Sequence, residues 1–182
     1  MSGHRKKTIV ELTRCSASEY ISAPKRPLRL LIDNVRSMHN VGSLFRTSDA
    51  FAVDLVVLAG ITGRPPHPEI SKTALGADES VKWEYAEDAV AATAAMKAEG
   101  WKVCVLEQAV GSVPLGKFRP DPAERYLLVV GNEVEGVDQR IVDMADTVIE
   151  IPQSGVKHSL NVAASGAIAL WHISSGLQIP NI

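Results

Sequence analysis

The sequence predicts an α/β domain whose sheet is mostly parallel and is flanked by helices. Short, continuous apolar runs recur along the chain, as expected of strands that are buried on both faces. Between these runs lie segments in which apolar residues recur at helical spacing. Strands that alternate with helices form parallel sheets, because each helix returns the chain to the edge where the preceding strand began.

The composition indicates one domain of ordinary size behind a short arm. The chain has 182 residues, of which 46% are hydrophobic and 22% are charged, as is typical of a globular protein. The predicted arm, 1–26, carries six basic and two acidic side chains, whereas the predicted domain, 27–182, carries 13 basic and 19 acidic ones. A basic arm on an acidic body suits a polyanionic partner, although a merely solvated tail has the same composition.

Several classes of protein are not expected. No apolar run approaches the roughly 18 residues that span a membrane, and the basic N-terminus lacks the apolar segment of a secretory signal. The two cysteines, Cys15 and Cys104, form no CxxC motif and the histidines are scattered, so no metal site is expected. So few cysteines suit a reducing compartment, and we expect the cytoplasm. Residues 111–117 match the GxxxxGK pattern of a phosphate-binding loop. Such a loop needs serine or threonine at the next position, where Phe118 stands, so an NTPase is not expected.

The first half of the chain contains three predicted strands and two predicted helices. The apolar run LRLLI predicts a strand over 28–32, and strands are also expected over 54–60 and 80–85. A helix is expected over 41–53, where Asn40 stands in a good position for an N-cap. A short helix is expected over 69–75, after a proline-rich loop.

The second half alternates in the same way. An alanine-rich helix over 87–100 is closed by Gly100, and strands are expected over 101–107, 125–131 and 146–152. A helix is expected over 137–145, and a final, fully apolar helix over about 159–175. The final helix is rich in small residues, which allow either close packing on its own sheet or a subunit interface.

Three predicted strands end in loops with unusual polar content. The sequences are DNVRSMHN after the first strand, GNEVEG after 125–131, and QSGVKHSLN after 146–152. In open parallel sheets, ligands bind beyond the carboxyl ends of strands, so these loops predict a ligand site. Gly131 at a strand end would let the backbone approach a flat ligand closely. Each residue also has a structural alternative: Asn40 and Asn161 as helix caps, and Arg46 as a solvated side chain.

Together, the three loops resemble the three motifs of the SpoU (TrmH-like) branch of the SPOUT RNA methyltransferases. The matching segments are DNVRSMHNVGSLFRTSDAFAV (33–53), LLVVGNEVEGVD (127–138) and IEIPQSGVKHSLNVAASGAIAL (149–170). They stand in the family's order, and the similarity covers roughly residues 28–175. The resemblance implies a deep trefoil knot in the C-terminal part of the α/β domain, which is a rare exception to the usual rules of chain topology.

The resemblance also implies a reaction, a cofactor and a set of site residues. S-adenosyl-L-methionine would supply a methyl group to a ribose 2′-hydroxyl in tRNA or rRNA, and the protein would act as a homodimer with the last helix near the interface. The cofactor-binding positions carried over are Leu106, Glu107, Gly131, Ile151 and Leu160. The catalytic positions carried over are Asn40, Arg46, Glu133, Ser159 and Asn161.

Alternatives to ribose methylation stay open at this point. A catalytically inactive RNA-binding or ribosome-assembly factor of the same fold would be expected to have lost Asn40 or Arg46, and both are present. Base methylation occurs in other SPOUT branches, although the SLN of the third motif favours ribose. Many family members carry a separate RNA-binding domain, whereas about 26 residues precede this domain. We therefore expect the arm, the 61–72 loop and the dimer surface to select the RNA.

Overall fold

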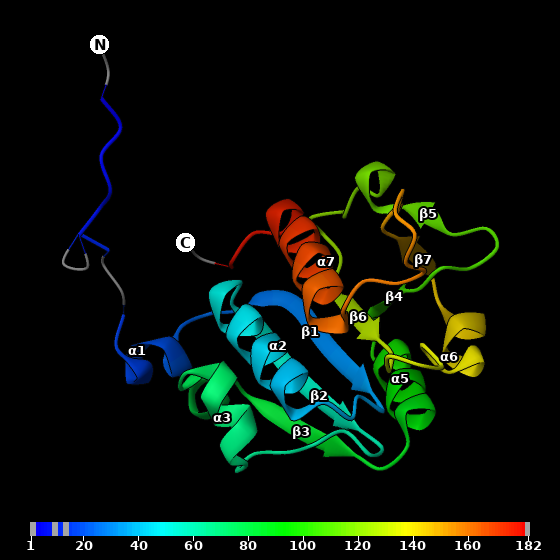
Figure 1. The fold of residues 1–182 in the computed structure, drawn as a ribbon, viewed down its shortest axis with the longest axis horizontal. Helices are drawn as coiled ribbons and strands as arrows, with labels where there is room; N and C mark the ends of the chain where they lie inside the picture. The colour runs from blue at the N-terminus through cyan, green and yellow to red at the C-terminus, as the bar shows by residue number, and fades with distance from the viewer. Residues whose placement is uncertain (1–2, 9–10, 13–14, 181–182) are drawn as a thin grey trace.

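The computed structural model describes residues 3–8, 11–12 and 15–180, so residues 9–10 and 13–14 of the predicted arm lie outside it. Seven strands form one sheet in the order β3-β2-β1-β6-β4-β7-β5 (Figure 1). Every pairing between the described strands is parallel. The predicted α/β class with a parallel sheet is therefore confirmed, while the trefoil knot that the resemblance implies stays a prediction.

Every predicted strand and helix has a counterpart in the structure, with shifted boundaries. The elements of the first half are α1 (Ala17–Ser22), β1 (Arg26–Asp33), α2 (Met38–Ala50), β2 (Val53–Ala59), α3 (Pro68–Ala74), α4 (Ala77–Ser80), β3 (Trp83–Ala86) and α5 (Ala89–Ala98). The strand predicted over 80–85 begins later, because α4 takes up residues 77–80. Neither α1 nor α4 was predicted.

The second half follows the predicted order with one addition. Its elements are β4 (Lys102–Leu106), β5 (Val113–Pro114), a short 3₁₀ helix η1 (Leu115–Lys117), β6 (Tyr126–Val130), α6 (Gln139–Met144), β7 (Thr147–Glu150) and α7 (Val162–Gly176). The two-residue strand β5 lies in the segment expected to be a loop, and it forms one edge of the sheet. None of the described helices is long and apolar enough to cross a membrane.

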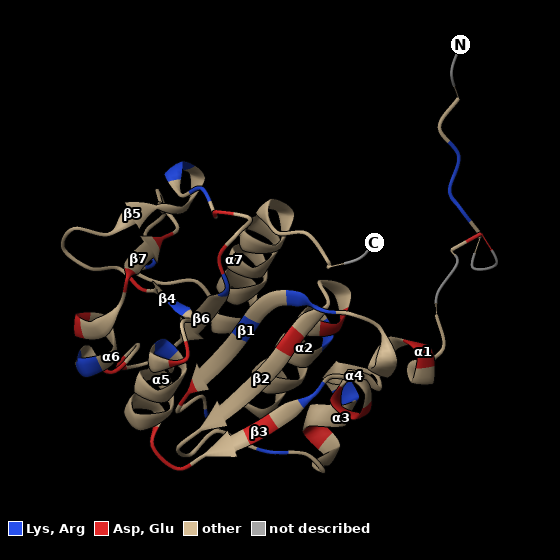
Figure 2. Ribbon diagram, turned by 180° about the vertical axis from the view of Figure 1, so that it is seen from behind, with Lys and Arg blue, Asp and Glu red and all other residues tan. Residues whose placement is uncertain are grey.

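The sheet separates two hydrophobic cores, which explains why its central strands are largely apolar. On β1, Leu30 and Ile32 belong to the core that includes residues of α2, α3 and α7, whereas Leu31 belongs to the core of α5 and α6. The side chains of β6 alternate in the same way: Leu128 belongs to the core of α2, α3 and α7, and Leu127 belongs to the core of α5 and α6. Helices α2, α3 and α7 cover the face seen in Figure 1, and Figure 2 shows the opposite side, where α5 lies.

Two of the shifted helix starts bear on the predicted site residues. The helix α2 begins at Met38, and Ser37 caps it by accepting a hydrogen bond from the backbone N–H of Asn40 at 3.3 Å. The prediction that Asn40 is the N-cap is therefore wrong, because a serine three residues earlier does this as well as an asparagine. The helix α7 begins at Val162 and is capped by Asn161, so Ser159 lies before the helix.

Two basic side chains of the predicted arm contact other parts of the same chain. Arg26 is the first residue of β1, and its guanidinium donates to the carbonyl oxygens of Phe51 at 3.0 Å and Ser174 at 3.1 Å. The Lys25 ammonium lies over the ring of Tyr20, 4.2 Å from its centre. These contacts tie the end of the arm to the helices α1, α2 and α7, and they occupy both cations.

Candidate functional site

The main cavity lies at the carboxyl ends of β4, β6 and β7, which are neighbours in the sheet. It has a volume of about 350 Å³, within the range of small-molecule sites. Its walls come from the segments that follow these strands and from the start of α7: 106–108, 130–136, 150–151, 153, 158–160, Val162 and Ser165. The cavity therefore lies beyond the carboxyl ends of strands, where the polar loops predicted a ligand site.

The structure gathers most of the predicted site residues around this cavity. All five positions predicted to bind the cofactor line it: Leu106, Glu107, Gly131, Ile151 and Leu160. Two of the five predicted catalytic residues, Glu133 and Ser159, line it as well. The other three, Asn40, Arg46 and Asn161, do not belong to its lining.

A chain of side-chain hydrogen bonds brings Asn40 and Asn161 to the site. The amide nitrogen of Asn40 donates to a carboxylate oxygen of Glu133 at 2.7 Å. The amide nitrogen of Asn161 donates to the amide oxygen of Asn40 at 3.0 Å. The amide oxygen of Asn161 accepts from the backbone N–H groups of Ala163 and Ala164, at the start of α7. One residue from each sequence motif thus takes part in a single hydrogen-bonded row.

Arg46 is the exception among the predicted catalytic residues. It lies on α2 as an exposed side chain, outside the lining of the cavity. Within the described residues, its guanidinium has no hydrogen-bond or ion-pair partner. The structure of one chain therefore leaves this cation facing solvent.

Gly131 is needed by its own loop. A Cβ at this position would lie 2.1 Å from the carbonyl carbon of Gly136 and 2.2 Å from the nitrogen of Val137. The loop folds back because Asn132 accepts hydrogen bonds from the backbone N–H groups of Val134 and Glu135, at 2.9 and 2.7 Å. The neighbour that approaches this glycine is therefore protein backbone. The sequence-based explanation, close approach of a flat ligand, does not account for this contact.

Glu107 uses its carboxylate to join two walls of the cavity. One oxygen accepts from the backbone N–H of Val137 at 3.1 Å, and the other accepts from the backbone N–H of Gln108 at 2.8 Å. Its own backbone N–H donates to the carbonyl of Ile149 at 3.0 Å. The residue thus connects β7 with the loop that follows β6, and its side chain already has protein partners.

The predicted set of site residues leaves out several residues that shape the cavity. Gln108, Asn132, Gln153 and His158 all line it, and each stands beside a strand end or a predicted site residue. Proximity to a strand end was the available signal. Their hydrogen-bond partners depend on how the three loops fold together.

The lining of the main cavity is acidic. It includes four glutamates and, among the residues that the structure describes, neither lysine nor arginine. The glutamates are Glu107, Glu133, Glu135 and Glu150. Such a site favours a ligand that carries positive charge and disfavours polyphosphates. Within the described part of the chain, no cluster of three or more metal-ligating side chains is found.

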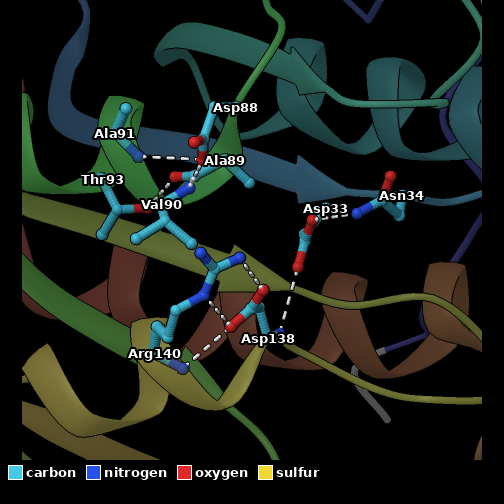
Figure 3. Close-up of polar contacts among 9 residues, drawn as sticks. All are labelled: Asp33, Asn34, Asp88, Ala89, Val90, Ala91, Thr93, Asp138 and Arg140. Atoms are coloured by element: carbon cyan, nitrogen blue, oxygen red, sulfur yellow. Dashed lines mark hydrogen bonds and ion pairs between the residues drawn. The ribbon is translucent and has the colours of Figure 1, made fainter.

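A second cavity lies near the carboxyl ends of β1 and β2, and Figure 3 shows residues around it. The buried carboxylate of Asp33 accepts from the side chain of Asn34 at 2.8 Å and from the backbone N–H of Asp138 at 3.2 Å. Burial raises the pKa of Asp33, whereas the hydrogen-bonded guanidinium of Arg140 lowers the pKa of Asp138. None of the predicted cofactor-binding or catalytic residues lines this second cavity, so the first cavity is the better candidate.

Comparisons with known proteins give matches over most of the chain. The model of the SpoU rRNA Methylase family matches residues 27–171. The 23S rRNA (guanosine(2553)-2′-O)-methyltransferase RlmP of Bacillus subtilis is 32% identical over 151 residues, which are 79% of this chain and 56% of that protein. The chain therefore spans about half the length of that relative.

Solved structures of the same family have the same fold. The A. aeolicus TrmH/SpoU tRNA modifying enzyme superposes with a TM-score of 0.78 at 28% identity, over 88% of this chain and 80% of that one. An AdoMet-bound rRNA methyltransferase from Sinorhizobium meliloti superposes with a TM-score of 0.76 at 26% identity, over 86% of this chain and 59% of that one. With the family model matched over most of the domain, this chain belongs to the SpoU rRNA methylase family.

Proposed function

We propose that this protein is an S-adenosylmethionine-dependent RNA methyltransferase that modifies a ribose 2′-hydroxyl in tRNA or rRNA. The observation that carries the proposal is the coincidence of two predictions in one place. The cavity at the strand ends is lined by all five predicted cofactor positions, and Glu133 in its wall is hydrogen-bonded to Asn40. Relatives named as guanosine 2′-O-methyltransferases support the ribose over the base.

The residues of the cavity fit S-adenosylmethionine. When bound, this cofactor supplies an electrophilic methyl group on a positively charged sulfonium. The four glutamates suit its positive charges, while Leu106, Ile151 and Leu160 offer apolar surface for an adenine ring. Gly131 and Gly136 lie in the loop that forms one wall, and neither adds a side chain to the cavity.

The protein's contribution to the reaction would be alignment and charge stabilisation. A ribose hydroxyl is a poor nucleophile, so it must be held in line with the methyl group. The row from Glu133 through Asn40 to Asn161 is rigid enough to orient a hydroxyl at the rim of the cavity. We assign the guanidinium of Arg46 to the RNA phosphate or the developing alkoxide.

A calorimetric titration tests the cofactor assignment. S-adenosylmethionine is expected to bind at about one site per chain, whereas ATP and NADH should not bind, because the acidic lining opposes polyphosphates. Tight binding of ATP or NADH in place of S-adenosylmethionine would refute the assignment. If binding appears only when RNA is added, the site is completed by the substrate.

Replacing Asn40 with alanine should lower the rate of methyl transfer by at least about tenfold, because it removes the link between Glu133 and Asn161. Affinity for S-adenosylmethionine should change little, since Asn40 does not line the cavity. The matched control is Thr47→Ala on the same helix, where the hydroxyl bonds only the carbonyl of Ser43. Equal rates for the two variants would remove Asn40 from the catalytic set.

The homodimer is part of the proposal, and an uncovered apolar stripe supports it. The helix α7 was expected either to pack closely on its own sheet or to form a subunit interface, and Ala164, Ile168 and Trp171 are exposed along one face. Trp171 is 59% exposed and Ile168 is 42% exposed. Contiguous exposed apolar surface of this kind is typical of protein interfaces.

Substitution of Trp171 by glutamate should separate the subunits. Light scattering after gel filtration should give the wild type about twice the 19.6 kDa of one chain, and the variant about the mass of one chain. Leu75→Glu, at another exposed apolar residue, is the matched control and should remain dimeric. A wild type that elutes with the mass of one chain would contradict the proposed dimer.

We propose that the surface beside the first turn of α2, where Asn40 lies, selects the RNA. In the 61–72 loop, the Arg64 guanidinium lies over the exposed ring of Tyr85, 4.1 Å from its centre. The hydroxyl of Thr73 bonds the carbonyl of His39, so α3 is tied to the start of α2, next to Asn40. An exposed pair of cation and aromatic ring is suited to stack unpaired bases.

One observation favours the second candidate, a non-catalytic RNA-binding protein of the same fold. Arg46 stands outside the cavity, so the structure of one chain does not complete the predicted catalytic set. Bound S-adenosylmethionine without methyl transfer to any RNA would favour this candidate. For either candidate we propose the cytoplasm as the place of action, because both described cysteines are free thiols.

A further inference from the structure

The wall of the cavity formed by residues 152–160 has few attachments to the rest of the protein. All nine residues are exposed, and they belong to no helix or strand. At one end Ile151 packs against the core, and at the other Asn161 caps α7. Among the described residues, this segment makes one hydrogen bond, in which the side-chain amide of Gln108 donates to the carbonyl of His158 at 2.7 Å.

Gln108 is well placed to hold this wall, because its own position is fixed. Its backbone N–H donates to the Glu107 carboxylate, whose other oxygen accepts from Val137. The backbone of Glu107 is in turn bonded to Ile149 of β7. The Glu107–Gln108 pair therefore joins all three walls of the cavity: one through Val137, one through Ile149, and the third through His158.

We infer that Gln108 is a positioning residue, which keeps segment 152–160 against the cavity so that Ser159 and Leu160 face the cofactor. The inference rests on the proposed function in one respect, that S-adenosylmethionine occupies this cavity. Without the bond, the segment spends part of its time away from the wall, and cofactor binding must first bring it back. Affinity for the cofactor should fall, whereas the rate at saturating cofactor should not change.

Two variants separate the hydrogen bond from the volume of the side chain. Gln108→Met keeps the length of the side chain and its neutral charge but removes the donor, and Gln108→Ala removes both. The matched control is Gln178→Ala, at an exposed glutamine that follows α7 and lies outside the cavity lining. A single net hydrogen bond corresponds to a change of about three- to tenfold in an equilibrium constant.

Trypsin reports on the segment without any cofactor, because Lys157 lies within it. In the free protein, both Gln108 variants should be cut after Lys157 about three- to tenfold faster than the wild type, since cleavage follows the population of the detached segment. Cleavage after the exposed Lys117 is the internal reference and should not change. Saturating S-adenosylmethionine should slow the cut after Lys157 in every protein.

The inference is supported if faster cleavage after Lys157, weaker cofactor binding and an unchanged kcat occur together in both variants. Weaker binding with unchanged cleavage overturns it, because Gln108 would then act by touching the cofactor directly. Unchanged binding, with or without faster cleavage, overturns it too. If the wild type binds S-adenosylmethionine neither alone nor with RNA present, the proposed function fails, and cleavage alone still decides whether Gln108 holds the segment.

Discussion

Replacing Arg46 with alanine is expected to lower the rate of methyl transfer by about a hundredfold or more, with S-adenosylmethionine affinity unchanged. The cation is exposed and outside the cavity, so the cofactor does not depend on it. Loss of a charge that stabilises a developing oxyanion typically costs this much in rate. Single-turnover rates with saturating RNA, together with a calorimetric titration of the cofactor, measure the two quantities separately.

Arg140→Ala is the matched control for the loss of one positive charge. Arg140 lies on α6, on the other side of the sheet, and it pairs with Asp138 of the same segment. Its removal should leave both rate and affinity unchanged. A rate for Arg46→Ala within a factor of about two of the wild type would deny Arg46 the catalytic role, since such a loss lies far below the contribution expected of an oxyanion stabiliser.

Replacing Gly131 with alanine is expected to abolish cofactor binding and to lower stability by about 1–3 kcal/mol. The added Cβ would lie within 2.2 Å of three backbone atoms of Gly136 and Val137. A flexible side chain could rotate away from the added Cβ, but these backbone atoms can move only if the loop 131–136 opens. That movement carries away Glu133 and one whole wall of the cavity.

Gly116→Ala is the control, because a Cβ there meets no atom within 4 Å. Urea unfolding measures the stability of both variants, and calorimetry measures their affinity for S-adenosylmethionine. Gly116→Ala should match the wild type in both measurements. Normal affinity in Gly131→Ala would show that the loop can rearrange without loss of the site, and it would separate Glu133 from cofactor binding.

The fold class was predictable because burial on both faces leaves a clear mark on the sequence. Neighbouring residues of β1, such as Leu30 and Leu31, belong to different cores, so apolar residues are favoured at both alternating positions. The order of the strands was not predictable in this way. Periodicity says nothing about the neighbours of a strand, and β6 lies between β1 and β4, which precede it in the chain.

The polar loops predicted the strand ends at which the cavity lies, whereas the cap of α2 was misread because two residues compete for that role. Ser37 and Asn40 are both good N-cap residues, and the sequence could not decide between them. The structure gives the cap to Ser37 and leaves the Asn40 amide to Glu133. In the same way, the contact of Gln108 with His158 joins residues 50 positions apart, which no local pattern encodes.

The most direct test of the account is methyl transfer itself. The purified protein is incubated with S-adenosylmethionine labelled in its methyl group and with total RNA from cells that lack the gene. The RNA is then hydrolysed with alkali. Because a 2′-O-methyl group blocks cleavage at its own nucleotide, we predict label in dinucleotides. Label in mononucleotides would place the methyl group on a base, and no transfer by a protein that binds the cofactor would contradict the proposed enzyme.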